Sequence, residues 1–168
     1  MNRRSLLVAG AAGVAALAGC STDKEADVTD TEALNKAFLE RFNDMREAEG
    51  VDTATQSDVL IDMASAHAEN MAEHDYLGHE QPDGTTIEDR YRDRGLLPQC
   101  ELPEPGTERY YPGTENVAGA VANSQNRHRG STDTYYVGGA DSLAEFVLDS
   151  WMESSDHREV MTLPAIRE

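Results

Sequence analysis

The chain has 168 residues, a length that suits one globular domain behind a short leader. Its 32 acidic residues outnumber 14 basic ones, giving a formal net charge of −18, and only Lys24 and Lys36 are lysines. This charge repels nucleic acid and anionic lipid headgroups, so we predict no nucleic-acid partner. An acidic, lysine-poor surface suits a halophilic microbe, where salt screens self-repulsion; a merely soluble acidic surface is the alternative.

The N-terminus has the form of an export signal. Arg3 and Arg4 precede the apolar run 5–18, and Leu17-Ala18-Gly19-Cys20 has the form of a lipobox. The apolar run is too short to span a bilayer comfortably, whereas two acyl chains on Cys20 would give a stable anchor. Twin-arginine export and general secretory export both remain open.

Three regions follow from this interpretation. Residues 1–19 are predicted to be a lipoprotein signal peptide, residues 20–30 a lipidated cysteine with a polar tether, and residues 31–168 the folded domain. The predicted location is the outer face of the cell membrane, and the membrane is a partner through the lipid on Cys20.

Two amphipathic helices are predicted in the first part of the domain. Apolar residues recur at helical spacing from Leu34 to Met45, and Gly50 ends that helix. A second helix follows Ser57, with an apolar face formed by Leu60, Ala64, His67, Ala68 and Met71. On that face, His67 is expected to be a packed, hydrogen-bonded core histidine rather than a ligand.

The middle of the chain predicts turns and loops around one short helix. Thr85 and Glu88 form the predicted capping box of this helix, directly after the turn sequence Pro82-Asp83-Gly84. Four prolines in residues 96–114 favour a loop, and the small apolar residues 116–122 favour a short strand.

The last third begins with a mostly polar stretch, residues 121–139, in which Asn123–Gly130 resembles a solvated insertion. His128 in this stretch is expected to be exposed. Ser142 and Glu145 predict the cap of a core helix, and Asp156 predicts the cap of a final short turn.

Three polar segments stand out from this background: Gly78–Gly84, Glu115–Ala118 and Trp151–Arg158. They contain two imidazoles, His79 and His157, and the carboxylate of Glu115. Two neutral imidazoles can ligate zinc while a carboxylate orients a ring or adds a ligand. The same groups can position water for acid–base chemistry, or they can form a buried polar network that only joins loops.

These segments also carry a family resemblance. The order H-x-x-P-D-G, E-N-V-A and W-M-x-S-x-x-H-R resembles the microbial branch of the CAP superfamily, which is named after cysteine-rich secretory proteins, antigen 5 and pathogenesis-related 1 proteins. Cys100 alone cannot form an internal disulfide once Cys20 carries lipid, so the resemblance is to a disulfide-free member.

The resemblance implies an α/β fold, a three-layer α/β/α sandwich with a small antiparallel sheet. The sequence ends at Glu168, before the two further strands that the family has, so we expect a sheet lacking its last strands. A small sheet without them would be marginal in water.

The resemblance also implies a cleft lined by two histidines and two acidic residues. His79 matches the first histidine, Glu115 the acid of the family's "GEN" motif, and His157 the second histidine. Ser154 stands where the second acid is expected, and Thr114 replaces the motif's glycine. The implied cofactor is zinc or another divalent metal, with His79 and His157 as ligands and Glu115 as a further candidate.

The expected function is an exported, lipid-anchored binding module that holds a divalent metal or small ligand. A metal-assisted, peptidase-like hydrolase with Glu115 as base is the first alternative, and a structural envelope protein with a vestigial cleft is the second. His79-Glu80 begins an H-E-x-x-H pattern, but Asp83 occupies the second histidine's position, so this zinc-protease motif is excluded. Whether the protein is an enzyme stays open, with binding favoured over catalysis.

Overall fold

The computed structural model describes residues 28–97, 100–103 and 110–163. The predicted signal peptide, Cys20 and most of the predicted tether lie outside the described residues. The described residues contain, in chain order, five helices and four short strands: α1 (Thr31–Ala48), α2 (Asp58–His74), α3 (Ile87–Asp93), β1 (Glu101–Pro103), β2 (Tyr110–Pro112), β3 (Ser124–Asn126), β4 (Tyr135–Val137), α4 (Ala140–Glu153) and α5 (Ser155–Met161). Within the described ranges, no helix is both long and apolar enough to cross a bilayer.

The strands form two antiparallel pairs. β1 pairs with β2, with Leu102 opposite Tyr111, and β3 pairs with β4, with Gln125 opposite Tyr136. Helices combined with short antiparallel strands confirm the predicted α/β class with a small antiparallel sheet.

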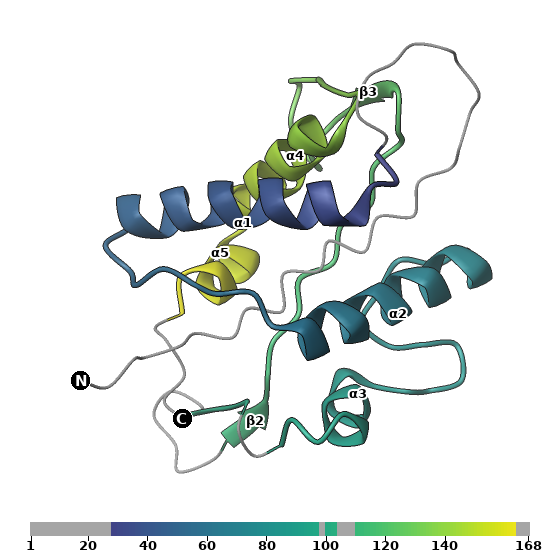
Figure 1. Cartoon of the computed structure of the whole chain (residues 1–168). Helices are drawn as coiled ribbons and strands as arrows, with labels where there is room; N and C mark the ends of the chain where they lie inside the picture. The colour runs from purple at the N-terminus through teal and green to yellow at the C-terminus, as the bar shows by residue number, and fades with distance from the viewer. Residues whose placement is uncertain (1–27, 98–99, 104–109, 164–168) are drawn as a thin grey trace.

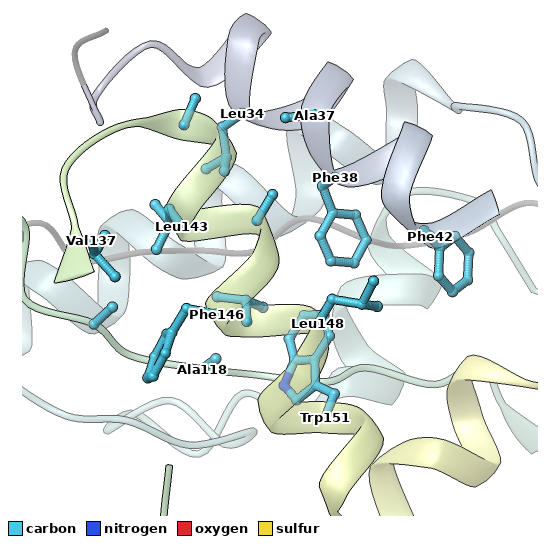
Figure 2. Close-up of a cluster of buried hydrophobic side chains, with 14 of the residues drawn as sticks. Leu34, Ala37, Phe38, Phe42, Ala118, Val137, Leu143, Phe146, Leu148 and Trp151 are labelled. Atoms are coloured by element: carbon cyan, nitrogen blue, oxygen red, sulfur yellow. The ribbon is translucent and has the colours of Figure 1, made fainter. Parts of the chain in front are cut away.

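The larger core lies between α1 and α4. Figure 2 shows Phe38 and Phe42 of α1 facing Leu148 and Trp151 of α4. Trp151 meets Phe38 edge to face, with ring centroids 5.6 Å apart. Burial of aromatic side chains of this size is the main stabilising contribution to such a core.

A second, smaller core lies between α2 and α3. It contains Leu60, Met63, Tyr91, Leu96 and Cys100. In Figure 1, α1, α4 and α5 form one group, and α2 and α3 form another. Burial raises the pKa of the Cys100 thiol, which disfavours the nucleophilic thiolate.

The two predicted helices of the first part are confirmed. Asp30 caps α1 by accepting a hydrogen bond from the Ala33 N–H, and Gly50 adopts a left-handed backbone just past its end. The predicted apolar face of α2 is buried, including His67. Asp75, also left-handed with φ 53°, ends α2 and turns the chain toward Gly78 and His79.

The predicted capping box of α3 is wrong by one residue. Thr86 rather than Thr85 accepts a hydrogen bond from the Asp89 N–H, and the Asp89 carboxylate accepts one from the Thr86 N–H at 3.0 Å. Thr85 belongs to the preceding turn instead, where its N–H donates a hydrogen bond to the Asp83 carboxylate at 2.9 Å.

The loop predicted for residues 96–114 and the strand predicted for residues 116–122 are both wrong. Residues 96–114 contain β1 and β2, which form a two-stranded sheet among the described residues. Both are therefore edge strands, which tolerate Pro103 and Pro112. Residues 116–122 do not form a strand, and side chains rather than a neighbouring strand make hydrogen bonds to two of their backbone groups. The Val117 carbonyl accepts from the Trp151 indole, and the Val121 N–H donates to Asn126.

The predicted solvated insertion, Asn123–Gly130, is wrong, because this segment contains β3 and a buried histidine. Residues 121–139 contain the β3–β4 hairpin, and His128 within it is buried rather than exposed. The caps predicted for the last two helices are wrong as well. Ser142 lies inside α4 and its hydroxyl accepts from the N–H groups of Gly138 and Gly139, while α5 begins at Ser155, before Asp156.

Candidate functional site

Glu115 lies at the centre of the candidate site and is positioned by α3. Gly113 passes so close to Tyr91 that a Cβ there would lie 2.2 Å from the ring carbon Cζ. The Tyr91 hydroxyl donates to the Thr114 carbonyl at 3.2 Å, and burial is the main reason that its pKa is raised. Because Arg90 precedes Tyr91 on α3, this close approach brings Glu115 within reach of a guanidinium.

Arg90 and Glu115 form a buried ion pair. Nη2 of Arg90 donates to Oε1 and Oε2 of Glu115 at 2.7 and 2.8 Å, and the two side chains are 7% and 9% exposed. Nη1 of Arg90 donates to the carbonyl of His79 at 2.9 Å. Arg90 therefore compensates the charge of the carboxylate and also fixes the backbone of the first predicted histidine.

His79 is held against the same carboxylate. Its Nδ1 lies 3.0 Å from Oε1 of Glu115, and its side chain is 51% exposed. An ionised carboxylate only accepts hydrogen bonds, so Nδ1 carries the hydrogen and Nε2 of the neutral ring carries a lone pair. Glu115 thus fixes both the orientation and the tautomer of a half-exposed imidazole.

His67 approaches Glu115 from α2. Its Nε2 lies 2.9 Å from the carbonyl of Gly78 and 3.6 Å from Oε1 of Glu115. The prediction of a packed, hydrogen-bonded histidine is confirmed. Since Nε2 donates to the carbonyl, Nδ1 is left as a buried acceptor with no partner among the described residues.

The third polar segment joins the site through one backbone carbonyl and one side chain. Nδ2 of Asn116 donates to the carbonyl of His157 at 3.2 Å, and the Trp151 indole donates to Val117. The His157 ring is part of α5, and its Nδ1 is buried without a hydrogen-bond partner within the described ranges. Two of the three predicted side chains, His79 and Glu115, are therefore in contact, and His157 is linked to them through Asn116.

The predicted metal ligands are His79, His157 and Glu115. The described residues include no group of three or more His, Cys, Asp or Glu side chains that could hold a metal ion. Glu115 is already engaged by Arg90 and His79. The described structure thus has no preassembled three-ligand zinc site at His79, Glu115 and His157.

Sequence reasoning identified His79 and Glu115 but missed Arg90, and it assigned His67 no contact with the acid. One signal for Arg90 was available, because it lies three residues after Ile87 and so shares the face of α3 that turns inward. Glu153 of α4, next to Ser154, lies against a different residue, with Oε2 3.0 Å from Nδ1 of His128.

Comparison with known proteins gives one clear result. A model of the family described as "CAP: Cysteine-rich secretory protein family" matches residues 39–168, well over half of the chain. Searches of curated proteins and of solved structures gave no significant match. The match spans α2 through α5 and includes every residue of the candidate site, so the chain belongs to the cysteine-rich secretory protein (CAP) family.

Proposed function

We propose that this CAP-domain protein is an exported, lipid-anchored binding module of the cell surface, whose contact point for ligand is the imidazole of His79. One observation supports the site: a nearly buried carboxylate holds Nδ1 of a half-exposed histidine. The Nε2 lone pair of such a ring can accept a hydrogen bond from a small ligand or bind a divalent cation.

The contacts of Glu115 favour a role in orienting His79 over a role as general base. Both of its oxygens accept from Arg90, and Oε1 also faces His79. These donors already occupy both carboxylate oxygens, which leaves little room for Glu115 to take a proton from a substrate or a water. The alternative hydrolase would therefore use His79, oriented by Glu115, as its general base.

Zinc titration calorimetry of the full chain with Cys20→Ser tests the binding role. Saturable binding that is lost in His79→Gln and kept in the matched exposed variant His74→Gln would support it. Loss in His157→Gln as well would mean that α5 contributes a second ligand. Equal weak binding by all variants would exclude a zinc site and favour either a non-metal ligand or the structural envelope role. Zinc-dependent peptide hydrolysis would favour the hydrolase.

Export and anchoring rest on the sequence of residues 1–20. Labelling cells with an alkyne fatty acid should mark the wild-type protein and should not mark Cys20→Ser. The variant should also leave the membrane fraction, because no lipid would retain it. A Cys20→Ser protein that stays labelled would refute the assignment of the anchor.

Adaptation to high salt rests on the charge of −18. If like-charge repulsion opposes folding, added KCl should raise Tm steeply up to molar concentrations, because the screening length shortens to about 3 Å at 1 M. A Tm that stays flat over this range would favour an ordinary acidic surface.

A further inference from the structure

His128 lies outside the candidate site, between the β3–β4 hairpin and α4. Its side chain is only 2% exposed. The ring stacks on Tyr135, with centroids 4.4 Å apart and an interplanar angle of 24°, and tilts against Phe146 at 4.7 Å. Tyr135 and Phe146 also meet each other, with centroids 5.7 Å apart, so the imidazole and the two aromatic rings, one from β4 and one from α4, form a three-ring cluster.

Both ring nitrogens of His128 face oxygen atoms of α4. Nε2 lies 3.0 Å from the carbonyl of Phe146, and Nδ1 lies 3.0 Å from Oε2 of Glu153. A carbonyl only accepts hydrogen bonds, and so does an ionised carboxylate. Glu153 is 52% exposed, and water solvates its ionised form. A neutral imidazole has one N–H and would satisfy one of these contacts; an imidazolium satisfies both.

The charged surroundings of His128 are mostly acidic. α4 contributes Glu145, Asp149 and Glu153, whose charges raise the pKa of Tyr135 after the larger effect of burial. Desolvation and the charge of Glu145 raise the pKa of Asp149, and His128 lowers it.

Further charged groups near His128 lie on other segments. Asp133, before β4, also acts on Tyr135. Arg41 of α1 is paired with Glu145 at 3.5 Å. Arg127 and Arg129, the neighbours of His128 in sequence, are exposed. The acids and the two aromatic faces compensate a buried cation at this position.

We propose that His128 is an imidazolium in the folded protein and serves as a pH-sensitive latch that holds the β3–β4 hairpin on α4. Loss of the proton leaves a lone pair facing an oxygen lone pair at one of the two contacts. That contact then becomes repulsive, and the hairpin loses one of its two hydrogen bonds from this ring to α4. Val137 stays buried at the base of β4, so the latch acts on the outer part of the hairpin.

Nitrogen NMR of the histidine rings in the ¹⁵N-labelled full chain tests the latch. At pH 7 we expect both ring nitrogens of His128 to have protonated shifts, while His67, whose contacts use Nε2 alone, shows one bare nitrogen. As rising pH removes the proton, the amide signals of residues 124–136 should move with the same midpoint. Those of His79 and Glu115 should not follow that midpoint.

Two results would overturn the proposal: a bare His128 nitrogen at pH 7, or hairpin signals that ignore the titration of the ring. Glu153→Gln keeps an oxygen acceptor but removes the charge, so it should move the midpoint to lower pH. The matched variant Glu159→Gln, which removes an exposed carboxylate of α5, should leave the midpoint in place. Equal midpoints in both variants would also count against the latch.

Discussion

Two residues determine where the Glu115 carboxylate lies: Gly113 acts through its backbone and Arg90 through its side chain. Gly113 permits the close passage over Tyr91, and Arg90 supplies the charge that makes burial of the acid tolerable. Both residues are buried, and neither was among the site residues predicted from the sequence.

Gly113→Ala should destabilise the protein by about 1–3 kcal/mol, because the new Cβ would overlap the Tyr91 ring. Urea denaturation measures the loss. The matched control is Gly119→Ala, whose Cβ would meet its nearest neighbour, Leu77, at an ordinary 3.6 Å. Equal stability of the two variants would mean that Tyr91 can move aside at no cost.

Arg90→Met should cost about 3–5 kcal/mol, because it leaves the Glu115 charge buried without its partner. The double variant Arg90→Met/Glu115→Gln should recover part of this loss, since the uncompensated charge is gone. Arg92→Met on the same helix is the control. Arg92 is 55% exposed, and its loss should cost less than about 1 kcal/mol. A double variant no more stable than Arg90→Met would contradict this account of the ion pair.

At the scale of elements, α3 has seven residues and relies on its capping box. Hydrogen bonds from the Thr86 side chain and backbone lower the pKa of Asp89 below its usual 3.8. A lowered carboxyl pKa contributes stability that is fully present above the ordinary value and is lost as pH falls through the folded-state value. Since α3 carries Arg90, acid should loosen the candidate site through the cap.

Asp89→Asn should therefore lower Tm above about pH 4. Below about pH 4, Tm of this variant should decrease less steeply with falling pH than Tm of the wild type. Thermal unfolding between pH 2.5 and 6 measures both effects. Asp93→Asn, an exposed acid at the other end of α3, should keep the wild-type slope. If Asp89→Asn also keeps the wild-type slope, the cap does not carry this pH dependence.

Helices were predictable from sequence where the apolar period was long. The faces of α1 and α2 follow directly from Leu34, Phe38 and Phe42 and from Leu60, Ala64 and Met71. The three-residue strands were not predictable, because three residues show no usable alternation and their pairing depends on distant partners.

In the candidate site, too, local patterns were predictable and contacts between distant residues were not. His79 and Glu115 were found by motif resemblance, but their contact depends on Gly113 passing over Tyr91, a tertiary close approach. The burial of His128 was missed because its neighbours Arg127 and Arg129 are exposed and polar. Its partners Phe146 and Glu153 lie 18 and 25 residues away, beyond any local pattern.

At the scale of the whole molecule, Arg46 connects the end of α1 to the end of α5. Its side chain donates to the carbonyls of Asp52, Met161 and Leu163 at 2.7, 2.8 and 3.0 Å. Arg46 is 1% exposed, and desolvation lowers its pKa despite the opposing charge of Asp52. Its guanidinium also lies 5.3 Å from the ring centre of Phe42.

Arg46→Lys should destabilise the protein by about 2–4 kcal/mol, because an ammonium on a shorter stem cannot reach all three carbonyls and leaves buried acceptors unpaired. Guanidinium denaturation provides the measurement. Arg41→Lys, at a surface pair 39% and 52% exposed, is the control and should stay within about 1 kcal/mol of wild type. A loss as small as that of the control would show that Arg46 is replaceable by any cation.

The same three hydrogen bonds bear on the order of events in folding. The contact of Arg46 with Met161 closes a loop of 115 residues, whereas those of Glu115 with Arg90 and His79 span 25 and 36. Closing the longer loop costs more chain entropy, so the Arg46 contacts are expected to form after the transition state. Weakening them would then shorten the lifetime of the folded molecule while leaving the speed of its formation nearly unchanged.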